Sequence, residues 1–319
     1  MKKRIYILLA LGALAVLTAF SAQAQDSVRD ALRLCADTII PSLFPFFVLS
    51  VLLNRLGLPG MLSRLMGRAA SALFGVSGEG ASALFIGLTG GYPMGASYIA
   101  DMYLCGRIDR EEGQRLLAFC NNSGPAFIIG AVGAGAFRST AAGLMLYGVH
   151  IVSALLTGLI FAGSRRSAEK LPAADDGAAL GSALTDAVKG AVTSVLNVCG
   201  FVVIFSVLVG LLDCSGYFSR LCLILGSVNG LGPDSTRVLL TGLLELGSGA
   251  GSLRYLPLSP ASLALAAFLL GFGSVSVHCQ TAAVISRTDM KGTLHFAGRL
   301  SMAFISALLA YVCGIIFLK

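Results

Sequence analysis

Two adjacent carboxamides and a hydroxyl interrupt an apolar stretch near the middle of the chain, at Asn121, Asn122 and Ser123. Polar side chains inside lipid are costly unless they are paired, so they either join helices to one another or bind a ligand. Amide and hydroxyl groups can hydrogen-bond a sugar hydroxyl, the edge of a nucleobase or an ion. We therefore interpret the three residues as candidate solute contacts, with hydrogen bonding between helices as the alternative.

A second polar group lies in the last third of the chain, where polar and apolar residues alternate at Ser274, Ser276, His278 and Gln280. Strict alternation is typical of extended backbone rather than of a helix. We therefore expect an extended break between two half-helices, and we interpret these four side chains as further candidate solute contacts. His150 and His295 lack such polar neighbours, so we interpret both as structural.

Glu245 is an acidic residue in another apolar run. An ionisable side chain inside a membrane segment marks a functional site by default. Glu245 is therefore a candidate solute contact and the candidate for coupling to a proton or cation. An ion pair with Arg254 or His278 is the alternative.

Helix-breaking residues occur at two places: Gly90, Gly91, Pro93 and Gly95 surround Tyr92, and Gly124 and Pro125 follow Ser123. Backbone groups that a break frees within a membrane must be satisfied by protein or by a water-filled cavity. Pairs of broken helices form the substrate site in many transporters. We expect the Tyr92 hydroxyl and the freed backbone groups to face such a site, with a simple kink in the helix as the alternative.

The composition places these residues in a membrane protein. The 319-residue chain is 56% hydrophobic and 12% charged, whereas soluble domains carry about 25% charged residues. The Lys and Arg residues behind the net charge of +7 lie in short loops, where an excess marks the cytoplasmic side. We predict an all-α, polytopic bundle of helices in the bacterial cytoplasmic membrane, surrounded by lipid and without a nucleic-acid partner.

Signatures of catalysis and of metal binding are missing from the sequence. It contains no phosphate-binding loop, no zinc-protease helix motif and no nucleophile elbow. The eight cysteines include no C-x-x-C pair and no Cys/His cluster with metal-ligand spacing. We therefore expect no enzymatic activity, no cofactor and no bound metal. Cys214 and Cys222 lie near a possible external loop, where they could form a disulfide.

Apolar stretches that approach the length of a membrane span occur at 5–22, 31–53, 81–104, 116–137, 141–162, 187–212, 238–256, 261–285 and 294–318. Shorter amphipathic segments lie at 62–74 and 218–228. We predict an N-terminal membrane helix or signal-like segment at 1–25 and a first repeat at 26–163. A polar linker at 164–186 precedes a second, inverted repeat at 187–319.

The repeat is suggested by similar short runs that recur along the chain. Asp30 and Asp186 begin similar four-residue runs, and Ser50 and Ser206 begin similar three-residue runs at the same spacing. Segment 81–104 contains the first break, and the arginines that follow it remain cytoplasmic only if it is a re-entrant hairpin. An equivalent hairpin at 238–256 would give the second half the opposite orientation, an architecture common among secondary transporters.

Four runs, at 40–47, 87–96, 119–125 and 271–280, resemble the sporulation integral membrane protein YlbJ family. The likeness extends over 26–318. That family contains the nucleoside recognition or Gate domain, which is shared with spore maturation proteins A and B and with the membrane parts of ferrous-iron transporters. It is distantly similar to concentrative nucleoside transporters, which have inverted repeats and re-entrant hairpins. No GTPase is attached here, so the resemblance does not imply iron uptake.

The resemblance implies a role in spore formation and leaves two classes of function open. In the first, the protein transports or gates a small polar solute, such as a nucleoside, between its two halves. In the second, it is a non-transporting membrane scaffold for assembly of the spore envelope. A homo-oligomer is compatible with both.

Overall fold

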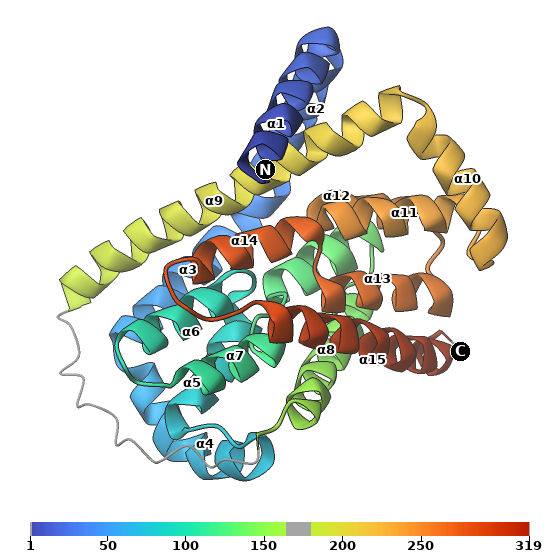
Figure 1. Ribbon diagram of the computed structural model, residues 1–319. Helices are drawn as coiled ribbons and strands as arrows, with labels where there is room; N and C mark the ends of the chain where they lie inside the picture. The colour runs from blue at the N-terminus through green and yellow to red at the C-terminus, as the bar shows by residue number, and fades with distance from the viewer. Residues whose placement is uncertain (1, 164–179, 319) are drawn as a thin grey trace.

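The computed structural model describes residues 2–163 and 180–318, and in those two ranges the chain is helical and contains no strand (Figure 1). Within these two ranges, five helices are long and apolar enough to cross a membrane, or six if one bent pair counts as a span. Large apolar side chains such as Leu196, Ile204 and Phe304 point outward, where they contact lipid. The chain is therefore an integral membrane protein with the predicted all-α fold.

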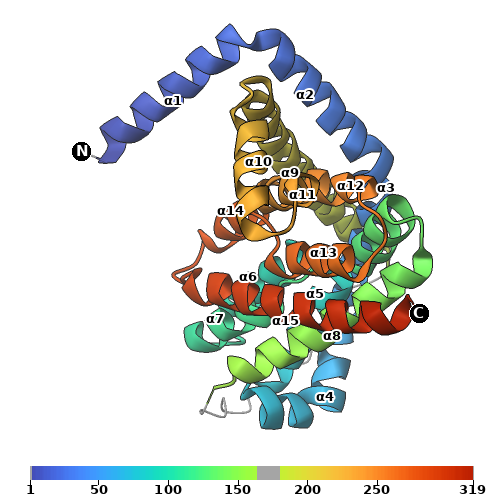
Figure 2. The ribbon, with the colours of Figure 1, turned by 90° about the vertical axis from the view of Figure 1, so that its right-hand side faces the viewer.

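The N-terminal segment forms one helix, α1, and one longer continuous rod, where the sequence predicted spans at 5–22 and 31–53. Helix α1 (Lys2–Ala19) extends away from the rest of the protein (Figure 2). Helix α2 (Ser21–Leu34) continues through a π-helical turn, η1 (Cys35–Ile39), into α3 (Ile40–Arg55). The continuous 35-residue rod is about 52 Å long, so it extends beyond a hydrocarbon core of about 30 Å.

Helix α9 (Leu180–Cys214) is a second 35-residue rod, and it packs antiparallel to α2–α3. The C-terminal end of α3 meets the N-terminal end of α9, where Arg55 and Asp186 form an ion pair at 3.7 Å. At the other end, Ser27 of α2 lies so close to Gly210 of α9 that a Cβ on the glycine would be 2.0 Å from the serine Oγ. The two rods thus cross the bundle side by side and in opposite directions.

The first predicted break is confirmed as the tip of a helical hairpin. Helix α4 (Leu58–Phe74) is bent by 95° from α5 (Gly78–Gly90), and α6 (Met94–Leu104) then doubles back along α5. Ser82 of α5 and Tyr98 of α6 share a hydrogen bond of 2.8 Å. Since α5 has 13 residues, it is about 20 Å long and too short to cross a membrane.

The second predicted break is also confirmed. Helix α7 (Arg110–Phe119) is separated by residues 120–125 from a π-helix, η2 (Ala126–Ala136). Helix α8 (Thr140–Ile160) then completes the first half.

The second half has the same order of elements as the first: α9, α10 (Tyr217–Asn229), α11 (Pro233–Leu244), α12 (Leu246–Ser252), η3 (Leu253–Tyr255), α13 (Pro260–Phe272), α14 (Val275–Ile285) and α15 (Thr293–Phe317). Helices α11 and α12 double back at Glu245, since a Cβ on Gly249 would be 2.1 Å from the Cα of Gly242. The division into two repeats stays a prediction. Most of the predicted linker, 164–179, lies outside the described residues, and residues 180–186 belong to α9.

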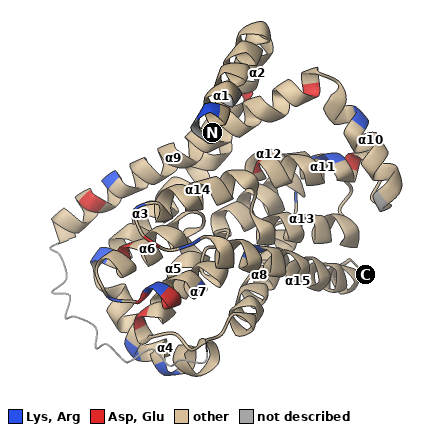
Figure 3. Ribbon diagram, in the orientation of Figure 1, with Lys and Arg blue, Asp and Glu red and all other residues tan. Residues whose placement is uncertain are grey.

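Charged residues lie mainly toward the ends of the helices, around α4, α5 and α7, at the start of α9 and near α10 (Figure 3). The middle of the bundle is almost free of them in this view. A charged residue in the interior therefore stands out, and two of them, Glu245 and Arg299, are buried close to the helix breaks.

Candidate functional site

The two breaks of the first half cross each other at glycines. A Cβ on Gly91, whose φ is +79°, would lie 3.0 Å from the backbone nitrogen of Gly124. A Cβ on Gly87 would lie 1.6 Å from the carbonyl oxygen of Cys120, and one on Gly95 would lie 2.1 Å from the same atom. The unwound chain at 120–124 thus passes directly against the hairpin, at a distance that any side chain would prevent.

Asn121 and Asn122 are fully buried, and their amides join separate elements. The Asn121 Nδ2 donates to Thr281 Oγ1 at 2.9 Å, and its Oδ1 accepts from the backbone N–H of Ala96 at 3.2 Å. The Asn122 Nδ2 donates to the carbonyl of Phe119 at 2.8 Å. Both side chains therefore hold the break in place, as the helix-joining alternative predicted.

Arg299 is a residue of this site that the sequence analysis missed. It lies in α15, is fully buried, and donates to Asn122 Oδ1 at 3.0 Å, to the carbonyl of Ala118 at 2.8 Å and to Tyr92 Oη at 3.3 Å. Among the described residues it forms no ion pair with a carboxylate. An arginine inside the apolar run 294–318 is itself the signal that could have identified it.

Glu245 is the break between α11 and α12. Its backbone is extended, and its carboxylate accepts from the N–H of Gly247 at 2.8 Å and from that of Ser248 at 2.5 Å. These N–H groups belong to the first turn of a helix, where they are otherwise unpaired and favour negative charge. In the part of the chain that the structure describes, Glu245 forms no ion pair with Arg254 or His278, so that alternative is wrong.

The fourth break, between α13 and α14, is shorter than predicted. The chain breaks at Gly273, whose φ is +84°, and Ser274 Oγ accepts from the N–H of Val277 at 3.1 Å as the N-cap of α14. The predicted extended segment is therefore wrong, because an N-cap serine starts a helix at the next residue. Ser276 and Gln280 consequently lie one helical turn apart, and Gln280 Nε2 donates to Ser276 Oγ at 3.4 Å.

A central cavity is lined by residues of three of the breaks and by α14, which begins after the fourth. Four of the nine predicted site residues line it: Tyr92, Ser123, Glu245 and Gln280. About 50 Å³ is open to the centres of water molecules, enough for a few waters at about 10–15 Å³ each. Ser123 Oγ and Gln280 Oε1 are buried and have no hydrogen-bond partner among the described residues. The cavity wall thus offers a carboxylate and two unused oxygen atoms.

The other five predicted residues, Asn121, Asn122, Ser274, Ser276 and His278, do not line this cavity. His278 lies beside a second cavity, and its ring contacts His295 with 3.4 Å between the two Nδ1 atoms. His295 also contacts Asn121, and His150 Nε2 accepts from the N–H of Ser123 at 3.2 Å. The two histidines interpreted as structural therefore support the second break directly.

The cysteines are free throughout the described residues. Cys214 is exposed and Cys222 is buried, so the disulfide considered for them is not formed. Within the same residues, no group of three or more His, Cys, Asp and Glu side chains lies close enough together to hold a metal ion.

Comparison with known proteins gives one relative of high coverage. The chain is 30% identical over 304 residues to the sporulation integral membrane protein YlbJ of Bacillus subtilis (strain 168), which covers 86% of this chain and 74% of that protein. A solved structure of CNTnw in an outward-facing state is 14% identical, with a TM-score of 0.49 over 98% of this chain and 84% of that chain. A likeness at that level carries no conclusion about function. No model of a known protein family matches the chain.

Proposed function

Because the chain belongs to the family of the sporulation integral membrane protein YlbJ, we propose that it binds a small polar solute in the central cavity during sporulation. It transports or gates that solute across the bacterial cytoplasmic membrane and performs no chemistry on it. The solute class includes nucleosides.

The observation that carries this proposal is that three helix breaks, and the helix that begins after a fourth, line one cavity. Gly91 comes from the first break, Ser123 from the second and Glu245 from the third, and Gln280 lies in the second turn after the fourth. Breaks in membrane helices are tolerated where they line a cavity, and discontinuous helices build the substrate sites of many transporters. A protein that needed only a stable bundle would gain nothing from placing these breaks around one cavity.

The hydrogen-bonding groups that line the central cavity indicate which kind of ligand it would bind. The Glu245 carboxylate and the Gln280 Oε1 accept hydrogen bonds, and the Ser123 hydroxyl can accept or donate. They favour a ligand rich in hydroxyl or amino donors, or a cation. A nucleoside carries such donors on its ribose, but it is larger than the present cavity of about 50 Å³. Binding it would require the tips at Tyr92 and Glu245 to move apart.

The test is uptake and binding by purified protein in liposomes, with labelled nucleosides and other small polar solutes added one at a time. Glu245→Gln keeps the size of the side chain and removes its charge. We expect it to lower uptake at least tenfold, while Glu111→Gln, at an exposed position of α7, leaves uptake unchanged. Equal uptake by both variants, with correct folding verified by size-exclusion chromatography, would contradict the proposal.

A membrane scaffold for spore-envelope assembly is the second candidate, and one observation favours it. The amides of Asn121 and Asn122 are occupied by protein partners, so they act in packing. Under this alternative, a strain carrying Glu245→Gln at normal protein levels sporulates like the wild type. A sporulation defect together with lost uptake would favour transport.

A further inference from the structure

Three cavities lie along the contact between the antiparallel rods α2–α3 and α9. The central cavity contacts the middle of both rods, at Leu43 and Val198. A cavity of about 790 Å³, here called the Asp186 cavity, contacts the end of α3 and the start of α9. A cavity of about 260 Å³, the Asp30 cavity, contacts α2 and the end of α9.

The order of the lining residues shows that the cavities form a series. Along α2–α3 the cavities are lined in turn by residues within 27–34, 39–43 and 50–55. Along α9 the same three cavities occur in the reverse direction, at 206–210, 198–202 and 186–194. At 1.5 Å per residue, the outer cavities are about 30 Å apart along the rods. That distance matches the hydrocarbon thickness of a bilayer, which places the central cavity near the midplane.

The two outer cavities are lined by corresponding residues of the similar short runs noted in the sequence. Asp30 and Ser206 line one, and Ser50 and Asp186 line the other. Each of the two similar segments, 30–52 and 186–208, therefore supplies its aspartate to one outer cavity and its serine to the opposite one. Two similar segments produce this exchange when they lie side by side in opposite directions, as α2–α3 and α9 do.

Buried apolar side chains lie on the rods between the ranges that line the cavities. Phe47 and Val195 lie between the central and Asp186 ranges, and Cys35 lies between the central and Asp30 ranges. Met94, which lines the Asp186 cavity, and Leu246, which lines the central cavity, are buried as well. The three cavities are thus separate sections, with an apolar layer between neighbours in this conformation.

We propose that the Asp186 and Asp30 cavities are the two aqueous entrances of one solute path, which follows the α2–α3/α9 contact through the central cavity. This rests on the proposed function. The path opens to opposite sides of the membrane, and its two apolar layers are the barriers that a solute must cross.

Side-specific labelling of cysteines tests the path. Ser50→Cys and Ser206→Cys place the same substitution at corresponding positions of the two outer cavities. Phe304→Cys is the control, because this side chain is exposed on the outer surface of α15 and faces lipid. A charged, membrane-impermeant methanethiosulfonate reagent is added to right-side-out or inside-out vesicles, and peptide mass spectrometry locates the modified cysteines.

We expect Ser50→Cys to react from one side only, Ser206→Cys from the opposite side only, and Phe304→Cys from neither. Native cysteines give references, since the exposed Cys105 lines the Asp186 cavity and the exposed Cys214 ends α9 near the Asp30 cavity. Reaction of both variants from the same side, or of neither while Cys105 and Cys214 react, overturns the path. Labelling needs no solute, so a failed uptake assay with opposite-side labelling would remove the proposed solute and leave the path.

Discussion

Arg299 of α15 and Asn122 of the second break are joined by a hydrogen bond, with the guanidinium donating to the amide oxygen at 3.0 Å in a fully buried position. The same guanidinium reaches the carbonyl of Ala118 and the hydroxyl of Tyr92. One side chain of α15 therefore connects the second break with the tip of the first hairpin. A planar fork of donors can make such contacts together, whereas the ammonium of lysine is a single compact centre.

Arg299→Lys is accordingly expected to destabilise the protein although it keeps the charge. Loss of hydrogen bonds to a charged group costs about 1.5–3 kcal/mol. We expect a clearly lower midpoint of thermal unfolding in detergent. Arg220→Lys, at an exposed position of α10, is the control and should leave the midpoint unchanged. A midpoint for Arg299→Lys equal to that of the control would show that the contacts contribute little.

Gly87→Ala is expected to disrupt the crossing of the two breaks. Its Cβ would lie 1.6 Å from the carbonyl oxygen of Cys120, so the backbone must shift. A backbone clash in the core belongs to the most damaging class of substitution, with losses above about 4 kcal/mol. Folded yield and thermal stability report the loss.

The control for Gly87→Ala is Gly200→Ala in α9, where a Cβ meets nothing within 4 Å. Alanine replaces glycine in a helix with a gain of up to about 1 kcal/mol, so this variant should be at least as stable as the wild type. Normal yield and stability of Gly87→Ala would show that the two breaks do not pack as closely as described.

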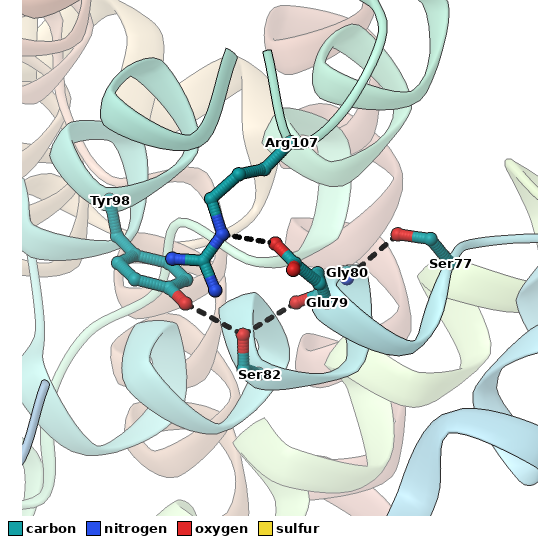
Figure 4. A network of polar contacts seen from close by, with 6 residues as sticks. All are labelled: Ser77, Glu79, Gly80, Ser82, Tyr98 and Arg107. Carbon is teal, nitrogen blue, oxygen red and sulfur yellow. Dashed lines mark hydrogen bonds and ion pairs between the residues drawn. The ribbon is translucent and has the colours of Figure 1, made fainter. Parts of the chain in front are cut away.

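Glu79→Gln tests the base of the first hairpin, where Glu79 at the start of α5 pairs with Arg107 beyond the end of α6 (Figure 4). The Glu79 side chain is 4% exposed and that of Arg107 is 25% exposed. Breaking a buried ion pair costs about 3–5 kcal/mol, and the partial exposure of Arg107 lowers this to about 2 kcal/mol. We expect faster amide hydrogen exchange in α5 and α6.

Asp26→Asn is the matched control for Glu79→Gln. Asp26 lies in α2, 3.2 Å from Arg29 and with its side chain 72% exposed, and exposed ion pairs contribute about 0–1 kcal/mol. Exchange in α5 and α6 should then stay close to that of the wild type. If Glu79→Gln gave the same small change, the pair would not hold the base of the hairpin.

The helix breaks could be predicted because their signals are local. Glycine at 91 and proline at 93 and 125 interrupt helices through their own backbone chemistry, without help from distant residues. The positive-inside rule then distinguished a hairpin from a span in the first half. The alternation from Ser274 to Gln280 misled for a local reason as well, because one serine acts as a helix cap and the residues after it are helical.

The contacts that assemble the site could not be predicted in the same way. Arg299 reaches residues 177–207 positions earlier in the chain, and no pattern along the sequence marks that proximity. Nor does any pattern along the sequence show which of the polar residues face the cavity. Ser123 faces the cavity while its neighbour Asn122 is turned toward Arg299, although both lie in the same break.

The close packing of Gly87 and Gly95 against the Cys120 carbonyl limits how the two breaks can move. The α5–α6 hairpin and the unwound segment 120–124 cannot slide along each other without an overlap of atoms. They must therefore move together as a rigid unit. Space for a larger ligand must then be made on the opposite side of the central cavity, by displacement of α9 or of the tip at Glu245. A crosslink from α9 to α12 would therefore be enough to prevent the movement that makes room for a larger ligand.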